Sequence, residues 1–166
     1  MRAVQLPANL YETLSYDPLA ADNYKALVAV LINSEVAGKP QHEVVLELGP
    51  TPDILVQHGF PQLPLVLKAK NISKMFFDHG MTKGLIERIP DLIANPKAIY
   101  KSTTTGSVLV TFEVKGMQSA PIIIAIHPNK TIGRNRITNE VASMYAKTGP
   151  NPEIRWRQDG LLIWER

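Results

Sequence analysis

The sequence predicts an α+β fold in which helices precede an antiparallel sheet of four to five strands. Two patterns indicate this class: apolar residues recur at helical spacing in the first part, and β-branched runs joined by short turns fill the last third. The length of 166 residues suits about one domain with a single core. We expect an N-terminal extension with one helix at residues 1–42 and a main domain at residues 43–166.

Three helices are predicted from the apolar spacing and from capping and stop residues. They run from Ala21 or Asp22 to the turn at 38–40, from 71 or 73 to about 79, and from 83 to 94. Pro90 lies inside the third pattern and either kinks that helix or splits it at Ile89. The first 19 residues show no clear period.

Short β-branched runs bounded by turn residues predict the strands. They cover residues 43–48, 98–102, 107–114 and 120–127, with an extended segment at 65–67 and a final hairpin made of 154–157 and 161–164. Short turns join the runs 98–102, 107–114 and 120–127, which is typical of an antiparallel meander, and the final hairpin completes the expected sheet of four to five strands.

Composition excludes several classes of function. The chain has no cysteine, so it forms no disulfide, thiolate zinc site or cysteine nucleophile. Its four histidines lack the spacing of a two-histidine metal motif, and we expect neither a metal nor a cofactor. No window approaches eighteen uncharged apolar residues, so no membrane-spanning helix is predicted.

Charge is unevenly distributed along the chain. Residues 1–57 carry three basic and seven acidic residues, whereas residues 58–166 carry fifteen basic and eight acidic ones. A basic segment of this size indicates a polyanionic partner, with nucleic acid first and an anionic membrane second. The alternative is an ordinary excess of solvated lysines.

Two short segments carry groups that suit phosphate chemistry. His79 follows a predicted helix and precedes Gly80, and histidine titrates near neutral pH. Its alternative role is to interact with the helix dipole. Lys101 and Ser102 end a predicted strand, where they could bind a phosphate or lie on the solvent face. His127, which precedes Pro128, could be a catalytic histidine at a strand end or a turn residue, and we prefer the turn.

The polar segment 133–145 combines arginines with hydroxyl and amide groups. As a strand it places Asn139, Val141, Ser143 and Tyr145 on one face, and as a helix starting at Thr138 it places Asn139 beside Ser143. Both geometries bring a hydroxyl and a phenol close to two arginines, and arginine binds phosphate with two parallel hydrogen bonds. The arginines are Arg134 and Arg136.

Several short motifs occur in an order that indicates a family. They are Leu48-Gly49-Pro50-Thr51-Pro52, Gly59-Phe60, Leu63-Pro64-Leu65, Lys74 with Asp78-His79-Gly80, Ile89-Pro90-Asp91-Leu92 with Asn95-Pro96, Tyr100-Lys101-Ser102, and Asn139-x-Val141-x-Ser143-x-Tyr145. With these motifs, residues 44–166 resemble the phage-associated barnase–EndoU–colicin–RelE-like nuclease domains. Such domains occur at the C-terminal end of MuF-type phage head proteins and in polyvalent mobile-element proteins.

The resemblance implies a metal-independent endoribonuclease with a RelE-like fold that cleaves RNA by attack of the 2′-hydroxyl on the adjacent phosphorus. It implies a phage or mobile-element toxin or effector acting in the host cytoplasm, carried in the virion or delivered. An inhibitor or a phage head protein would be a further partner. The alternative is a non-catalytic phage protein that binds a host protein or nucleic acid.

The resemblance and the polar segment together give the expected site. The catalytic residues would be His79, Lys101, Ser143 and Tyr145, and the substrate-binding residues would be Ser102, Arg134, Arg136, Thr138 and Asn139.

Overall fold

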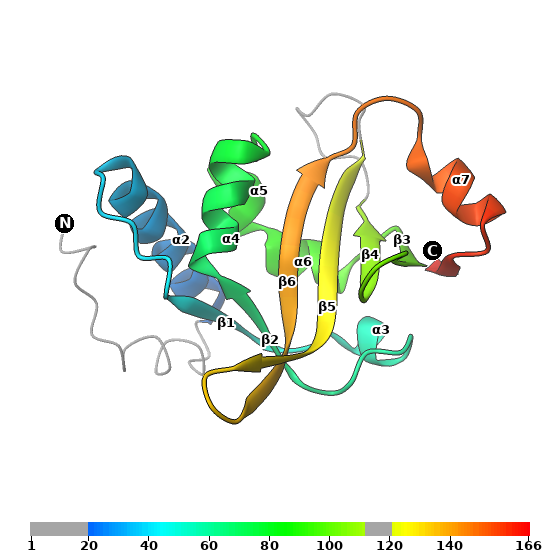
Figure 1. Ribbon diagram of the computed structural model, residues 1–166, viewed down its shortest axis with the longest axis horizontal. Coiled ribbons are helices and arrows are strands. Elements are labelled where there is room, and N and C mark those ends of the chain that lie inside the picture. Colours follow the sequence, from blue (N-terminus) through cyan, green and yellow to red (C-terminus); the bar gives the residue numbers. More distant parts are fainter. Residues whose placement is uncertain (1–19, 112–120) are drawn as a thin grey trace.

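The computed structural model confirms the α+β class and describes residues 20–111 and 121–166 (Figure 1). The end of the predicted strand 107–114 and the start of the strand 120–127 lie outside the described residues, as do residues 1–19. The helical elements are α2 (Ala20–Val36), α3 (Asp53–Val56), α4 (Ala69–Ser73), the π-helix η1 (Lys74–Asp78), α5 (Lys83–Glu87), α6 (Ile89–Ala94) and α7 (Pro152–Gln158). The strands are β1 (Val45–Pro50), β2 (Pro64–Lys68), β3 (Ala98–Lys101), β4 (Ser107–Val110), β5 (Ile122–Ile132), β6 (Arg136–Ala146) and β7 (Leu162–Glu165).

The sheet is larger than predicted and it is mixed. Seven strands lie in the order β1-β2-β6-β5-β4-β3-β7, so the expectation of four to five antiparallel strands is wrong. The difference arises at one pairing, because β2 runs parallel to β6 with Leu65 opposite Asn139 and Val66 opposite Glu140. This pairing adds β1 and β2 to the edge of an otherwise antiparallel sheet.

The predicted C-terminal hairpin is also wrong, because its first half is the helix α7. The Asn151 side chain accepts a hydrogen bond from the Glu153 N–H, which caps the helix, and Pro152 occupies the first turn. Asparagine followed by proline and an acidic residue is a helix-start pattern, and it outweighs the alternating apolar residues that suggested a strand.

The other predicted helices are present. The helix after residue 20 ends at Val36, before Gly38. The third helix is split at Arg88, with Pro90 in the first turn of α6, where its missing N–H costs no hydrogen bond. The second helix starts at Ala69 and changes into the π-helix η1 at Lys74.

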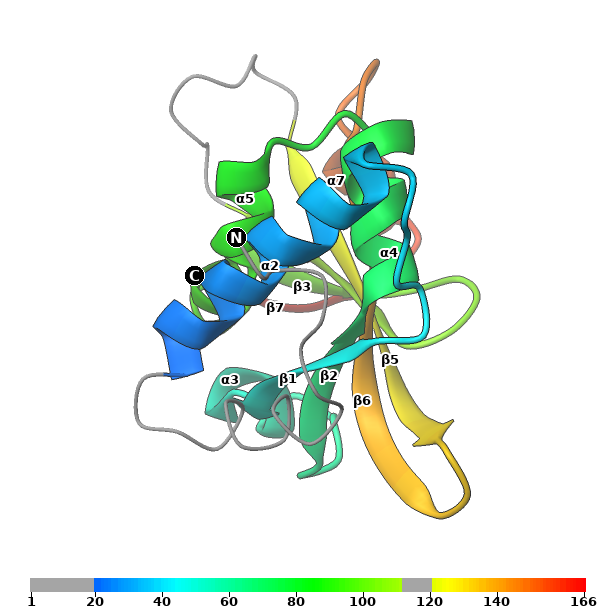
Figure 2. The same cartoon turned by 90° about the vertical axis from the view of Figure 1, so that its left-hand side faces the viewer.

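Helices α2, α4, α5 and α6 cover one face of the sheet, and Figure 2 looks onto this helical side. Helix α2 contributes buried apolar side chains to the same core as β1, β2, β5 and β6; they are Tyr24, Leu27, Val28, Leu31 and Ile32. The Tyr24 hydroxyl donates to the Ile86 carbonyl at 2.6 Å, which ties α2 to α5. Among the described residues, no helix is long and apolar enough to span a membrane.

Candidate active site

A β-bulge in β6 decides which of its side chains face the helices. Ala125 pairs with Ser143 while Ile126 pairs with Val141, so Ala142 is an extra residue on β6. Val141 and Met144 therefore both pack in the helical-side core, although three positions separate them. The polar segment is thus a strand, and the predicted face shared by Val141 and Ser143 is wrong because the bulge lies between them.

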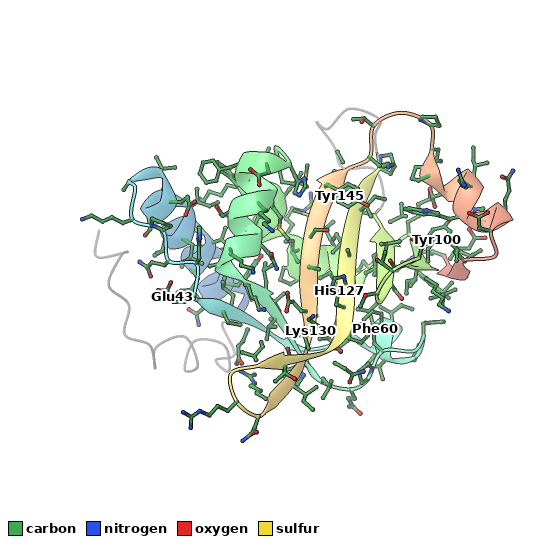
Figure 3. The ribbon with its side chains drawn as sticks, in the orientation of Figure 1. Glu43, Phe60, Tyr100, His127, Lys130 and Tyr145 are labelled. Atoms are coloured by element: carbon green, nitrogen blue, oxygen red, sulfur yellow. The ribbon has the colours of Figure 1, made fainter. Side chains whose placement is uncertain are left out.

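The opposite face of β5 and β6 carries a row of polar groups. Since neighbours of buried Val141 and Met144 point the other way, this face presents Glu140, Ser143 and Tyr145 from β6. Their cross-strand partners include Ala125 and His127 of β5. We call these five residues the central stripe. In Figure 3, Tyr145 and His127 lie along the two central strands, with Lys130 beyond His127.

Glu140 is the buried charge of the central stripe, with only 6% of its surface exposed. The Lys68 ammonium lies 3.3 Å from Oε2, and the Asn71 side-chain amide donates to Oε1 at 3.4 Å. Oε2 has no hydrogen-bond partner among the described residues. Glu140 is therefore a buried carboxylate whose charge Lys68 balances, and its Oε2 accepts no hydrogen bond from the described part of the chain although it is removed from solvent.

His127 lies directly across from Glu140 in the antiparallel ladder. It is a half-buried residue within β5, so its interpretation as a turn residue is wrong; a bulge at Pro128 and Asn129, not a turn, follows it. Burial lowers the pKa of His127, the nearby Lys130 charge lowers it further, and the Glu140 carboxylate partly opposes both. His127 is thus neutral at pH 7 and able to accept a proton.

Tyr145 and His79 meet at the other end of the central stripe. Their ring centroids are 6.0 Å apart with planes inclined at 44°. His79 is exposed and follows the π-helix, whose wider turn closes with a bond from the His79 N–H to the Lys74 carbonyl. Burial raises the pKa of Tyr145, so the phenol stays protonated at neutral pH. Single π-turns are rare in proteins, but those that occur are often found at functional sites.

Between these two ends the stripe has small side chains. Ser143 and Ala125 face each other. His127 lies two residues along β5 from Ala125, and on β6 Glu140 lies three residues before Ser143, because of the bulge, and Tyr145 two residues after it. Same-face neighbours in a strand are about 7 Å apart. The larger polar side chains therefore lie on either side of a centre formed by the small side chains of Ser143 and Ala125. This arrangement suits a substrate group held over Ser143 with a proton acceptor on one side and a donor on the other.

Lys101 and Ser102 lie elsewhere. Lys101 pairs with Ser107 and so aligns with Ile126 of the helical-side core, which places it on the opposite face from Tyr145. Three strand spacings, about 14 Å, separate β3 from β6. The Ser102 hydroxyl accepts from the Thr104 N–H at 3.2 Å in the β3–β4 turn. The structure therefore places His79 beside Tyr145, and Ser143 on the same face as Tyr145, without this pair.

Thr138 and Asn139 are fully buried and hydrogen-bonded within the protein. The Thr138 hydroxyl donates to the Lys130 carbonyl at 3.1 Å. The Asn139 amide donates to Thr51 Oγ1 at 2.8 Å and to the Pro61 carbonyl at 2.9 Å. These contacts join β6 to β5 and to the loops around α3, so neither side chain is presented to a ligand.

Arg134 and Arg136 lie near the tip of the β5–β6 hairpin. Arg136 forms an ion pair with Glu47 of β1, and Arg134 is exposed in the turn. Nine residues separate Arg134 from Ser143, which corresponds to about 30 Å of strand. These arginines are thus remote from the small centre of the stripe.

Lys68 and Glu140 were not predicted, and His127 was interpreted as a turn residue in preference to a catalytic one. Glu140 stands between the motif positions Asn139 and Val141, and only the bulge and the pairing with His127 reveal its surroundings. The His-Pro dipeptide at 127 imitates a turn. Among the described residues, no group of three or more His, Cys, Asp or Glu side chains is arranged to hold a metal ion.

The fold and site define a class: an α+β domain with α2, α4, α5 and α6 on one face of a mixed sheet, and on the other a polar stripe beside an apolar cluster that α7 covers with Trp156. The chain matches the family model of the phage MuF C-terminal domain over residues 70–165. Because the match spans more than half of the chain, the protein belongs to the phage MuF C-terminal domain family. No curated protein and no solved structure matches.

Proposed function

We propose that this phage domain is a metal-independent endoribonuclease of the barnase–EndoU–colicin–RelE-like type, acting as a toxin or effector in the host cytoplasm after delivery with the virion. The observation that carries the proposal is the central stripe. It offers a neutral imidazole across from a buried carboxylate, with a protonated phenol two positions beyond the small centre. Acid–base catalysis near neutral pH requires one group that is ready to accept a proton and another that is ready to donate one.

In this mechanism the scissile phosphate lies over Ser143. His127 takes the proton of the ribose 2′-hydroxyl, whose oxygen forms a new bond to phosphorus while the bond to the 5′-oxygen breaks. Tyr145 gives its proton to that leaving oxygen, which yields a 2′,3′-cyclic phosphate and a free 5′-hydroxyl. Solvent then returns both residues to their starting protonation states.

The charged neighbours assist the two proton transfers. The Glu140 carboxylate favours the imidazolium that forms on His127, because the negative charge of the carboxylate attracts the positive charge of the protonated ring. The Lys68 and Lys130 ammonium groups stabilise the negative charge that develops on the phosphate oxygens. His79, beside Tyr145, supplies a second imidazole at the leaving-group end.

The test measures degradation of a mixed RNA pool in EDTA. We expect wild-type cleavage with 2′,3′-cyclic phosphate ends, identified by mass spectrometry. His127→Ala and Glu140→Gln should each lower the rate by on the order of 10²–10⁴. His42→Ala and Glu43→Gln are matched controls on exposed side chains away from the stripe and should keep the wild-type rate (Figure 3).

Products with 5′-phosphate ends, or an EDTA-sensitive activity, would reject the mechanism. RNA binding without cleavage by the folded wild type would favour the non-catalytic alternative. Circular dichroism of each variant establishes that a lost activity is not a lost fold.

A further inference from the structure

The β5–β6 hairpin extends beyond the other described elements, and Figures 1 and 2 show its tip projecting from the body of the molecule. Residues 128–139, which form its outer part, include three basic side chains and no acidic one. Lys130 and Arg136 lie along the strands and Arg134 at the turn. A two-stranded ribbon with such a charge attracts a polyanion.

The same two strands carry the central stripe and the hairpin. Side chains of a strand alternate between its two faces, and β6 has no extra residue between positions 136 and 140. Arg136, Thr138 and Glu140 therefore lie on one side of β6, and Ile137 and Asn139 on the other. Its partner Glu47 confirms this side, because Glu47 pairs with Val66 next to Lys68 of β2. Thr138, between Glu140 and Arg136, is buried, so a strand of nucleic acid would leave the stripe at half-buried His127 and continue past half-buried Lys130 of β5 towards the turn.

The basic groups of this path differ in their availability. Lys68 and Arg136 are paired with Glu140 and Glu47. Arg134 and Lys130 form no ion pair with any described residue. Lys130 lies close enough to His127 to lower its pKa, so Arg134 is the cation that is remote from the chemistry.

We propose that the β5–β6 hairpin is a distal binding site for the RNA backbone, in which Arg134 contacts a phosphate about 30 Å from the scissile one. The inference rests on the proposed function and adds to it a preference for long, single-stranded substrates. Short RNA that occupies only the central stripe cannot reach Arg134. The hairpin then increases affinity for long chains without changing the bond-breaking step.

The test uses fluorescence anisotropy with uncleavable 2′-O-methyl RNA, a tetramer and a dodecamer of the same base composition. We expect Arg134→Ala to weaken dodecamer binding roughly threefold to tenfold and to leave tetramer binding unchanged. The slope of log affinity against log salt for the dodecamer should fall by about 0.7, the value for one lost phosphate contact on a single strand. Arg134→Lys should restore most of the affinity.

Lys39→Ala, which removes an exposed charge after α2, is the matched control and should change neither affinity. A DNA dodecamer should show the same dependence on Arg134, since the contact is to phosphate. Equal losses on both RNA lengths, or none on the dodecamer, would overturn the inference. If the dodecamer binds as expected but natural RNA is not cleaved, the proposed nuclease fails and the distal site stands.

Discussion

At the scale of single residues, Glu140 links the site to β2 and α4, and burying its charge costs free energy of folding. Its carboxylate is removed from water, and the compensation comes from Lys68 and Asn71, both contributed by the chain around the start of α4. Taking away one partner of a buried pair leaves the other charge uncompensated. Glu140 is an unspecified position of the motif Asn139-x-Val141-x-Ser143-x-Tyr145. The burial of its side chain, which decides what the carboxylate can do, is visible only in the fold.

The two ends of the stripe predict a broad pH profile. The lowered pKa of His127 places its protonation below its ordinary value of 6.5, and the raised pKa of Tyr145 places its ionisation above 10.0. We expect kcat/KM to be level at neutral pH, to fall on the acid side as His127 gains a proton, and to fall on the alkaline side as Tyr145 loses one. Rates on a dinucleotide across this range provide the measurement.

Tyr145→Phe should lower the rate and abolish the alkaline fall while the acid fall remains. Tyr100→Phe is the control, since its hydroxyl donates to Glu153 at 2.8 Å and lies outside the stripe. An alkaline fall that persists without the Tyr145 hydroxyl would assign the proton donor to another group.

At the scale of elements, the short β3–β4 turn is pressed against β5. Gly106 has a φ of +71°, and a Cβ at this position would lie 2.0 Å from the Ile126 carbonyl oxygen. Only glycine fits both the backbone conformation and the space. The sequence identifies a turn with glycine here, whereas only the structure shows its close approach to Ile126, twenty residues later in the chain.

Gly106→Ala should therefore destabilise the protein by more than about 1 kcal/mol, and it should disturb β5 next to His127. Gly160→Ala is a closely matched control, because its φ of +72° is nearly the same but nothing lies within 4 Å of the added methyl. Urea unfolding of the two variants separates the clash from the backbone strain. Equal losses of stability would show that β5 yields to the methyl group.

At the scale of the whole molecule, α2 and the sheet share one core. Helical periodicity is a local property, and it predicted α2 to within a residue or two. Pairing partners are not local, so the sequence could not show that β1 and β2 join the sheet through β6, nor that a bulge at Ala142 reverses the faces of β6. Of the expected site residues, His79 and Tyr145 have rings 6.0 Å apart and Ser143 shares a face with Tyr145, while the charged groups near them come from places that the sequence did not indicate.

If α2 belongs to one cooperative unit with the sheet, Leu31→Ala should destabilise the whole protein by about 2–5 kcal/mol. Val36→Ala on the same helix is the control, with an expected effect within about 0.5 kcal/mol, because Val36 is 68% exposed. Circular dichroism and the fluorescence of Trp156 and Trp164 should shift to the same lower urea midpoint. A fluorescence midpoint unchanged by Leu31→Ala would instead make α2 a separate unit.

The parallel pairing of β2 with β6 also has a consequence for synthesis. Leu65 leaves the ribosome more than seventy residues before its partner Asn139, so β2 waits for β6 while the chain between them is made. Contacts this distant in sequence form slowly, because the intervening loop must close first. Glu140 meets Lys68 only when that closure is complete, and the stripe is assembled among the last parts of the fold. The finished stripe thus exists only after β6 has left the ribosome.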